Sequence, residues 1–235
     1  MESSHIKLNV WLQAFFLMAS SKKGISSHQL HRALGITYKS AWFLTHRIRE
    51  AMRAGGLLPP MGGGGKTVEI DETYIGRLKG QPVRRGGSTH KNTVLTLVER
   101  RGSARSFHID DARVATILPI IRENVERETV LMTDEAAHYK TLGGEYFSHD
   151  TVNHAAKKYV RDEITTNTVE GYYSIFKRGM KGVYQHCAEK HLHRYLSEFD
   201  FRYSNRAALG VNDGERADLA VKGAAGKRLT YRPAN

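Results

Sequence analysis

Residues 67–75 read TVEIDETYI, an alternation of β-branched and polar residues that carries Asp71 near its middle. Such a pattern predicts a β-strand. The more continuously apolar residues 93–99 (TVLTLVE) predict a central strand, and residues 129–133 (TVLMT) predict a buried strand that ends at Asp134. Two of the predicted strands therefore each carry an aspartate.

The neighbouring segments complete the expected fold class. Residues 103–109 (SARSFHI) fit a further strand, and apolar residues recur at helical spacing over 114–125, where Pro119 should kink or divide the helix. Strands followed by a helix and another strand favour an α/β body with a mixed sheet flanked by helices.

Two more helices are expected further along the chain. Within residues 165–179 (TTNTVEGYYSIFKRG), Glu170 and Lys177 lie two helical turns apart and so project in nearly the same direction. A last helix is expected at about residues 191–203. The inward face of the first of these helices should consist of Val169, Tyr172, Tyr173 and Phe176.

The acidic residues of these elements suggest a metal site, provided that the fold brings them together. Hard divalent cations such as Mg²⁺ prefer carboxylate oxygens, and two such ions ~3.5–4 Å apart can promote phosphoryl transfer. Each residue also has a structural interpretation: Asp71 as a solvated strand residue, Asp134 as a helix cap, and Asn167 with Glu170 as a capping box. Spacing alone leaves these alternatives open.

A proline pair followed by four glycines, LPPMGGGGK at residues 58–66, predicts a linker between residues 1–57 and residues 67–205. Ahead of it, GISSHQLHRALGITYKSAWFLTHRIREAM predicts two helices separated by Gly35, with Ser26 or Ser27 capping the first and Thr37 the second. Two helices joined by a short glycine-containing turn form the helix-turn-helix pattern, whose second helix enters the major groove of DNA.

Charge is concentrated in this N-terminal region. The chain carries 36 Lys and Arg against 24 Asp and Glu, a net charge of +12, and residues 1–60 hold eight of the basic residues against two acidic ones. Such an excess suggests a polyanionic partner. A small helical bundle with a solvated basic face is the alternative. The residues expected to face DNA phosphate or solvent on the second helix are Lys39, His46, Arg47, Arg49 and Arg53.

Other features narrow the class of protein. The longest apolar stretch, residues 10–19, is half of the ~20 residues that a membrane helix needs, so nucleic acid is favoured over a membrane. The single cysteine, Cys187, excludes an internal disulfide framework and fits a cytoplasmic protein. Residues 206–235 form a basic tail, rich in Ala and Gly, that is expected to pack loosely or to be partly disordered.

Several motifs in order resemble those of bacterial insertion-sequence DDE transposases of the ISXO-like branch. They are VEIDETYIG, TDEAAHY, VNHAAKKYV, TNTVEGYYSIFKRG and HLHRYLSEFDFRYSNR, with the basic helical segment ahead of them. The resemblance extends from about residue 7 to residue 205. It implies an RNase H-like catalytic domain with divalent-metal carboxylates, and a DNA transposase that cuts transposon ends and transfers them into target DNA.

Carried over by position, the resemblance assigns Asp71 and Asp134 as metal ligands. The third member is Glu170 or Asn167, with Glu170 favoured for its charge, and Lys177 would neutralise a DNA phosphate. Two Mg²⁺ or Mn²⁺ ions, terminal inverted repeats and target DNA as partners, and a homo-oligomer on paired ends are implied in the same way. Relatives also carry a cysteine-rich zinc ribbon, which a chain with one cysteine cannot form, so a truncated copy or a short form is expected.

Two other functions fit the same sequence. One is a structure-selective nuclease on the same fold, which would cut DNA without joining ends to a target. The other is a catalytically silent DNA-binding remnant that competes at the repeats.

Overall fold

A computed structural model describes residues 4–55, 58–78, 80–82, 88–134, 137–142, 144–152 and 166–227. The motif at residues 152–160 lies almost entirely outside these ranges. The chain forms two compact units, each built from discontinuous segments. One consists of residues 1–56, 178–187 and 194–235, and the other of residues 57–177 and 188–193. The helix predicted at about residues 191–203 therefore belongs mainly to the same unit as the N-terminal helices. The sequence had predicted it as part of a domain of residues 67–205.

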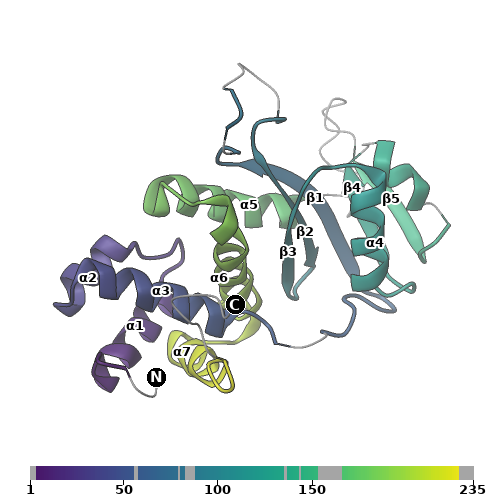
Figure 1. Cartoon of the computed structure of the whole chain (residues 1–235). Helices are drawn as coiled ribbons and strands as arrows, with labels where there is room; N and C mark the ends of the chain where they lie inside the picture. Colours follow the sequence, from purple (N-terminus) through teal and green to yellow (C-terminus); the bar gives the residue numbers. More distant parts are fainter. Residues whose placement is uncertain are drawn as a thin grey trace. The chain divides into compact units, whose positions relative to one another are not determined.

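The second unit contains a mixed five-stranded sheet in the order β3-β2-β1-β4-β5 (Figure 1). Strands β1 (Thr67–Ile75), β2 (Asn92–Glu99) and β3 (Ala104–Ile109) form an antiparallel meander, while β4 (Val130–Asp134) and β5 (Ser148–Val152) run parallel to β1. This order and these directions are those of the RNase H-like fold. Strand β5 was not predicted, because its sequence SHDTV lacks a run of apolar residues.

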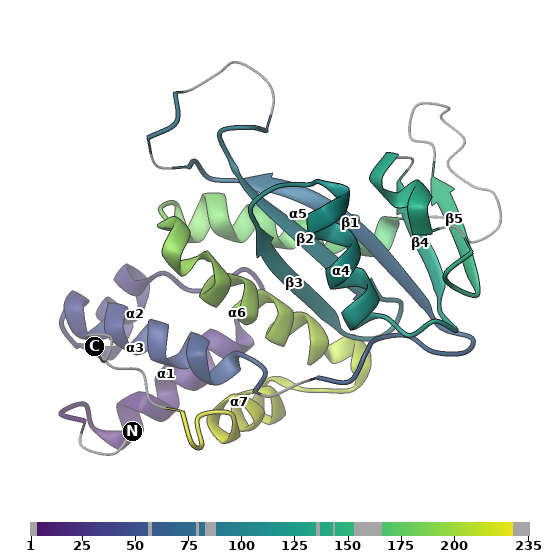
Figure 2. The same ribbon diagram turned by 45° about the vertical axis from the view of Figure 1, so that its right-hand side comes forward.

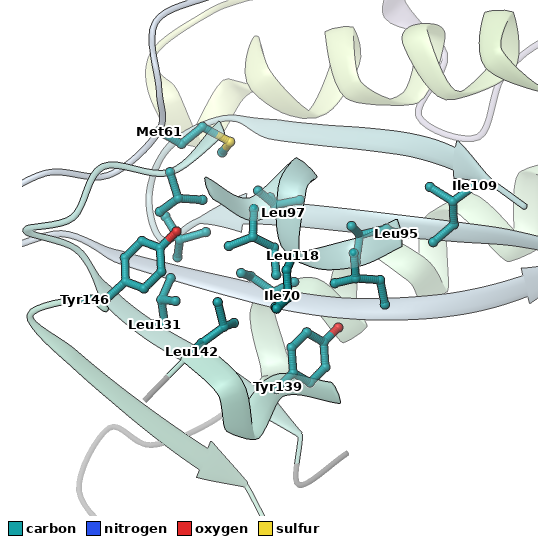
Figure 3. Close-up of a cluster of buried hydrophobic side chains, with 14 residues drawn as sticks. Met61, Ile70, Leu95, Leu97, Ile109, Leu118, Leu131, Tyr139, Leu142 and Tyr146 are labelled. Carbon is teal, nitrogen blue, oxygen red and sulfur yellow. The ribbon is translucent and has the colours of Figure 1, made fainter. Parts of the chain in front are cut away.

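One face of the sheet carries the main core of this unit. Helix α4 (Val114–Asn124) is a single helix that includes Pro119, so the proline does not divide it. Its residues Ile117, Leu118 and Ile121 pack with residues of β1, β2 and β4 and with Tyr139 and Leu142 of the 3₁₀ helix η1 (Ala137–Leu142) (Figure 3). Burying such a side chain contributes about 1.5–3 kcal/mol, and these contacts pack α4 against the sheet.

Helix α5 (Asn167–Gly179) covers the opposite face (Figure 2). Its four expected inward residues, Val169, Tyr172, Tyr173 and Phe176, are all buried. The Tyr172 hydroxyl lies 2.9 Å from Ser106 Oγ of β3. A π-helical turn, η3 (Met180–Tyr184), and a 3₁₀ turn, η4 (Glu189–His191), follow.

The segment at residues 58–66 is attached to the second unit along its length, which a plain linker would not be. Met61 is buried in the core, and its amide donates to the Asn124 carbonyl at 2.7 Å. The amide of Gly63 donates to Thr129 Oγ1 at 2.9 Å. Gly62, Gly63 and Gly65 have positive φ, which glycine adopts readily. From the sequence alone, glycines that are required for such a conformation look the same as glycines in a flexible linker.

The first unit contains helices α1 (Leu8–Ser20), α2 (Ser27–Leu34), α3 (Tyr38–Met52), α6 (Leu192–Ser204) and α7 (Asp213–Lys222), with the 3₁₀ turn η5 (Ala207–Leu209). Ser26 caps α2 in a capping box with Gln29, and Thr37 caps α3. Gly35 ends α2 in the left-handed conformation, with φ 63°. The expected inner face of α3 is buried throughout: Ala41, Leu44, Ile48 and Ala51.

The tail does not pack loosely over the residues that the structure describes. Helix α7 lies against α1, and its Ala217 and Ala220 enter the core of the first unit. Small side chains allow this close packing, and the same residues led to the wrong expectation of a loose tail. Across the described ranges, no helix combines the length and apolarity needed to cross a bilayer.

Candidate active site

Two aspartates, Asp71 and Asp134, lie on adjacent parallel strands. Glu69 of β1 pairs with Met132 of β4, and extending this register by two residues places Asp71 beside Asp134. Residues in register on parallel strands project from the same face of a sheet. Asp71 and Asp134 therefore share the face that α5 covers.

Helix α5 brings a third acid to this face. The Tyr173 hydroxyl donates to the carbonyl oxygens of Asp71 at 2.6 Å and of Val94 at 3.3 Å, which seats the helix directly on β1 and β2. Glu170 lies one turn earlier in the helix and is exposed to solvent. One of its carboxylate oxygens accepts from the Thr166 hydroxyl at 3.2 Å.

Asp71 lies in the field of other acidic side chains. The pKa of Asp71 is raised to about 7, mainly by burial, and the charges of Glu72, Asp134 and Glu170 contribute to this increase. The Glu72 amide, which donates to Asp71 Oδ1 at 2.8 Å, partly offsets them. Neighbouring carboxylates that disfavour one another's ionisation form a site where a cation is stabilised.

The donor set suits a hard divalent cation, because it offers carboxylate oxygens only. As the side chains stand, no three Asp, Glu, His or Cys residues in the described ranges are grouped closely enough to hold one ion. Asp71 and Asp134 are half-buried on neighbouring strands, and Glu170 is exposed on α5. The residues that could hold a metal are thus Asp71, Asp134 and Glu170.

The remaining residues predicted on α5 differ in their surroundings. Lys177 is half-buried, with its ammonium 5.7 Å from the ring centroid of Tyr173. Asn167 is exposed and is the first helical residue of α5, so it does not stand at the N-cap that the capping-box alternative requires.

Two glutamates of β1 have roles that the sequence did not predict. Glu69 is fully buried and accepts hydrogen bonds from the first turn of α5. Glu72, on the opposite face, accepts from the Tyr139 hydroxyl at 2.5 Å. Three acids within four residues of a largely buried strand were the available signal, since a buried carboxylate must have partners.

In the first unit, two of the five residues predicted to face DNA are buried. His46 and Arg49 are each 1% exposed. Arg49 Nε donates to Glu198 Oε2 at 2.7 Å, and its guanidinium lies 4.0 Å from the ring centroid of Tyr195. The prediction for these two was wrong because α3 is enclosed on two sides, with its second buried face against α6.

The other three residues retain contact with solvent. Lys39 and Arg53 are exposed, and Arg53 forms a surface ion pair with Glu50. Arg47 is half-buried, and its guanidinium stacks over the rings of Trp11 and Phe43.

The family model described as the ISXO2-like transposase domain matches residues 62–204. An uncharacterized transposase-like protein of Haemophilus influenzae is 28% identical over 97 residues, which are 41% of this chain and 77% of the relative. Among solved structures, a pre-cleavage Mos1 transpososome aligns over 98% of this chain and 83% of its own, with 12% identity and a TM-score of 0.37. A simian T-cell lymphotropic virus intasome in complex with PP2A regulatory subunit B56 gamma aligns over 73% and 67%, with 16% identity and the same TM-score.

Proposed function

The chain belongs to the family of ISXO2-like transposase domains, and from this premise we propose that it cuts DNA at the ends of an insertion sequence and joins them to a target. The observation that supports the proposal is the parallel pairing of β1 with β4, the strands of Asp71 and Asp134, together with the effect of the Asp134 and Glu170 charges on the pKa of Asp71. A phosphoryl-transfer enzyme of this kind needs such a carboxylate set and no covalent protein intermediate.

Each residue has a distinct part in the proposal. Asp71 and Asp134 hold two divalent cations, Mg²⁺ or Mn²⁺, and Glu170 completes the set, with Asn167 as its alternative. When bound, the cations supply Lewis-acid stabilisation of the attacking and leaving oxygens. Lys177 neutralises a phosphate beside the scissile bond through the positive charge of its ammonium. That ammonium lies on the same helix as Glu170, 5.7 Å from the ring centroid of Tyr173.

The reaction proceeds by two displacements at phosphorus. Water first attacks the phosphodiester at the transposon end, and the bond to the 3′ oxygen breaks as that oxygen takes a proton and becomes a 3′-hydroxyl. The 3′-hydroxyl then attacks a phosphodiester of the target. A new phosphodiester forms, and the target strand leaves with its own 3′-hydroxyl.

DNA recognition falls to the helix-turn-helix region in this proposal. Helix α3 follows α2 after a three-residue turn and exposes Lys39 near its start and Arg53 just past its end. Terminal inverted repeats and target DNA are the proposed partners, with a homo-oligomer bridging two ends.

The test is a cleavage and joining assay on DNA that contains a transposon end, with Mg²⁺ or with EDTA. We expect Asp71→Asn and Asp134→Asn to reduce cleavage to background and to leave DNA binding intact. Asp218→Asn, an exposed aspartate of α7, is the matched control and should cleave like the wild type.

The outcomes separate the three functions. Cleavage followed by joining supports the transposase. Cleavage without joining indicates a nuclease, and binding without cleavage indicates a silent DNA-binding protein. Full activity in either aspartate variant would remove the proposed site.

A further inference from the structure

Glu69 is a fully buried carboxylate on the central strand of the sheet. Its four described hydrogen-bond donors belong to three residues of the second unit: Thr168, Val169 and Arg100. Its Oε2 accepts from the amides of Thr168 at 2.7 Å and Val169 at 3.0 Å. Its Oε1 accepts from the Thr168 hydroxyl at 2.8 Å and from Arg100 Nε at 2.7 Å. The carboxylate therefore caps the first turn of α5 from a different element.

Burying the Glu69 carboxylate costs free energy of folding unless its charge and hydrogen-bonding capacity are satisfied. A buried carboxylate is destabilising unless charge and hydrogen bonds compensate for lost hydration. Arg100 supplies the opposite charge, and the first turn of α5 supplies amides at the positive end of a helix dipole. The first-turn amides, which a helix cannot satisfy internally, receive their acceptor from the sheet.

The position of Glu69 connects two members of the proposed site. Glu69 precedes Asp71 by two residues in β1, so both side chains project toward α5. The amides that Glu69 holds belong to the two residues that precede Glu170. One side chain thus joins the strand of Asp71 to the helical turn of Glu170.

We propose that Glu69 is a positioning residue, which holds the first turn of α5 at the distance from β1 that metal binding requires. The inference rests on the proposed function for the identity of the site. Glu69 itself touches neither metal nor DNA. It acts by restricting where Glu170 can lie relative to Asp71 and Asp134.

The test variant is Glu69→Gln, which keeps the shape of the side chain but removes its charge and one acceptor oxygen. Glu99→Gln is the matched control, because Glu99 is also a glutamate of this sheet, but the described partners of its carboxylate, the Gly62 amide at 3.1 Å and Lys66, belong to the segment at residues 58–66 and not to α5. Both variants are made in the full chain.

Three measurements are compared after circular dichroism has verified folding. Mn²⁺ affinity is measured without DNA, exchange is measured at the Thr168 and Val169 amides, and kcat and KM are measured on end-containing DNA. We expect Glu69→Gln to weaken Mn²⁺ binding about 10-fold, to accelerate exchange at both amides, and to lower kcat about 100-fold, the effect of a ~1 Å displacement, with KM unchanged. Glu99→Gln should match the wild type in all three.

A folded Glu69→Gln with wild-type Mn²⁺ affinity and kcat would overturn the proposal. So would a loss of kcat that merely follows the unfolded fraction. If Glu69→Gln does not fold, Thr168→Val replaces it, because it removes only the hydroxyl donor, and a 2- to 10-fold weakening of Mn²⁺ binding is expected from about one lost hydrogen bond. An unchanged affinity in that variant overturns the proposal.

Failure of the proposed function gives a different pattern. A wild-type chain that neither cuts nor joins DNA contradicts the transposase. The Mn²⁺ affinity and the amide exchange still decide the role of Glu69 in that case.

Discussion

At the scale of single residues, Asp71 has an environment unlike that of a solvated aspartate. It stands on a strand that α5 covers, beside Asp134 and within the field of Glu170. Asp71 is half-buried on this strand, and the neighbouring acidic charges distinguish its environment from that of an isolated aspartate in water. The same environment makes the metal-free protein sensitive to pH.

Asp71 should make the metal-free protein less stable as pH rises. Its pKa is raised from 3.8 to about 7 in the folded chain, so between these values the folded state binds more protons than the unfolded state, and the free energy of unfolding falls with increasing pH. We expect a decrease of about 1–3 kcal/mol between pH 4 and pH 7 from this group, after allowance for solvent screening. Urea unfolding in EDTA at four pH values measures it.

Asp71→Asn should flatten this dependence relative to the wild type, because the amide does not titrate. Asp218→Asn serves again as the control and should retain the slope. Equal slopes in the wild type and Asp71→Asn would contradict the assigned environment.

At the scale of elements, the segment at residues 58–66 shows how glycines can build a defined structure. Gly62 has φ 90°, and a Cβ there would lie 2.1 Å from Thr129 Oγ1. Gly64 has open space around its Cβ position and a φ outside the left-handed range. The structure therefore requires glycine at position 62 but has room for a larger side chain at position 64.

Gly62→Ala should therefore destabilise the protein by about 2–4 kcal/mol, through backbone strain and overlap with Thr129. Gly64→Ala should change stability by less than about 1 kcal/mol. Thermal unfolding of the two variants compares them directly. Similar melting temperatures would indicate that the segment is a plain linker after all.

At the scale of the whole molecule, the chain builds two units, each with its own core and from non-contiguous segments. The first unit draws α6 and α7 from the C-terminal part of the sequence. It also encloses a buried ionic cluster in which Glu198 accepts from Arg49, Arg202 and the Tyr184 hydroxyl. Basic residues of α3 consequently lie in different environments: Arg49 is buried in this cluster, and Lys39 is exposed.

Lys39 and Arg49 should respond to substitution in opposite ways. Arg49→Ala removes one of the two buried arginines that pair with Glu198 and should cost about 3 kcal/mol of stability. Lys39→Ala should leave stability within about 0.5 kcal/mol but weaken DNA binding and reduce its salt slope by about 1. Urea unfolding and a salt titration of DNA binding give the two readouts.

A result that Arg49→Ala is stable and binds DNA weakly would restore the original prediction for that residue. A result that Lys39→Ala binds DNA with an unchanged salt slope would place DNA contacts elsewhere in the chain.

Local pattern was sufficient for most elements of the fold. Strands β1 to β4, the caps of α2 and α3, and the inward faces of α3 and α5 were predicted, because alternation, helical spacing and capping residues act over a few neighbouring positions. Strand β5 and α7 were missed. Their burial depends on partners distant in the sequence rather than on their own hydrophobicity.

The sequence by itself determined the residue types of the candidate site and their order along the chain. Only the tertiary structure decided which of them meet. The strands of Asp71 and Asp134 pair in parallel, Glu69 attaches α5 to β1, and Glu198 holds Arg49 away from the surface. These outcomes depend on contacts between residues up to about 150 positions apart, and no local preference encodes the free energy of such a contact.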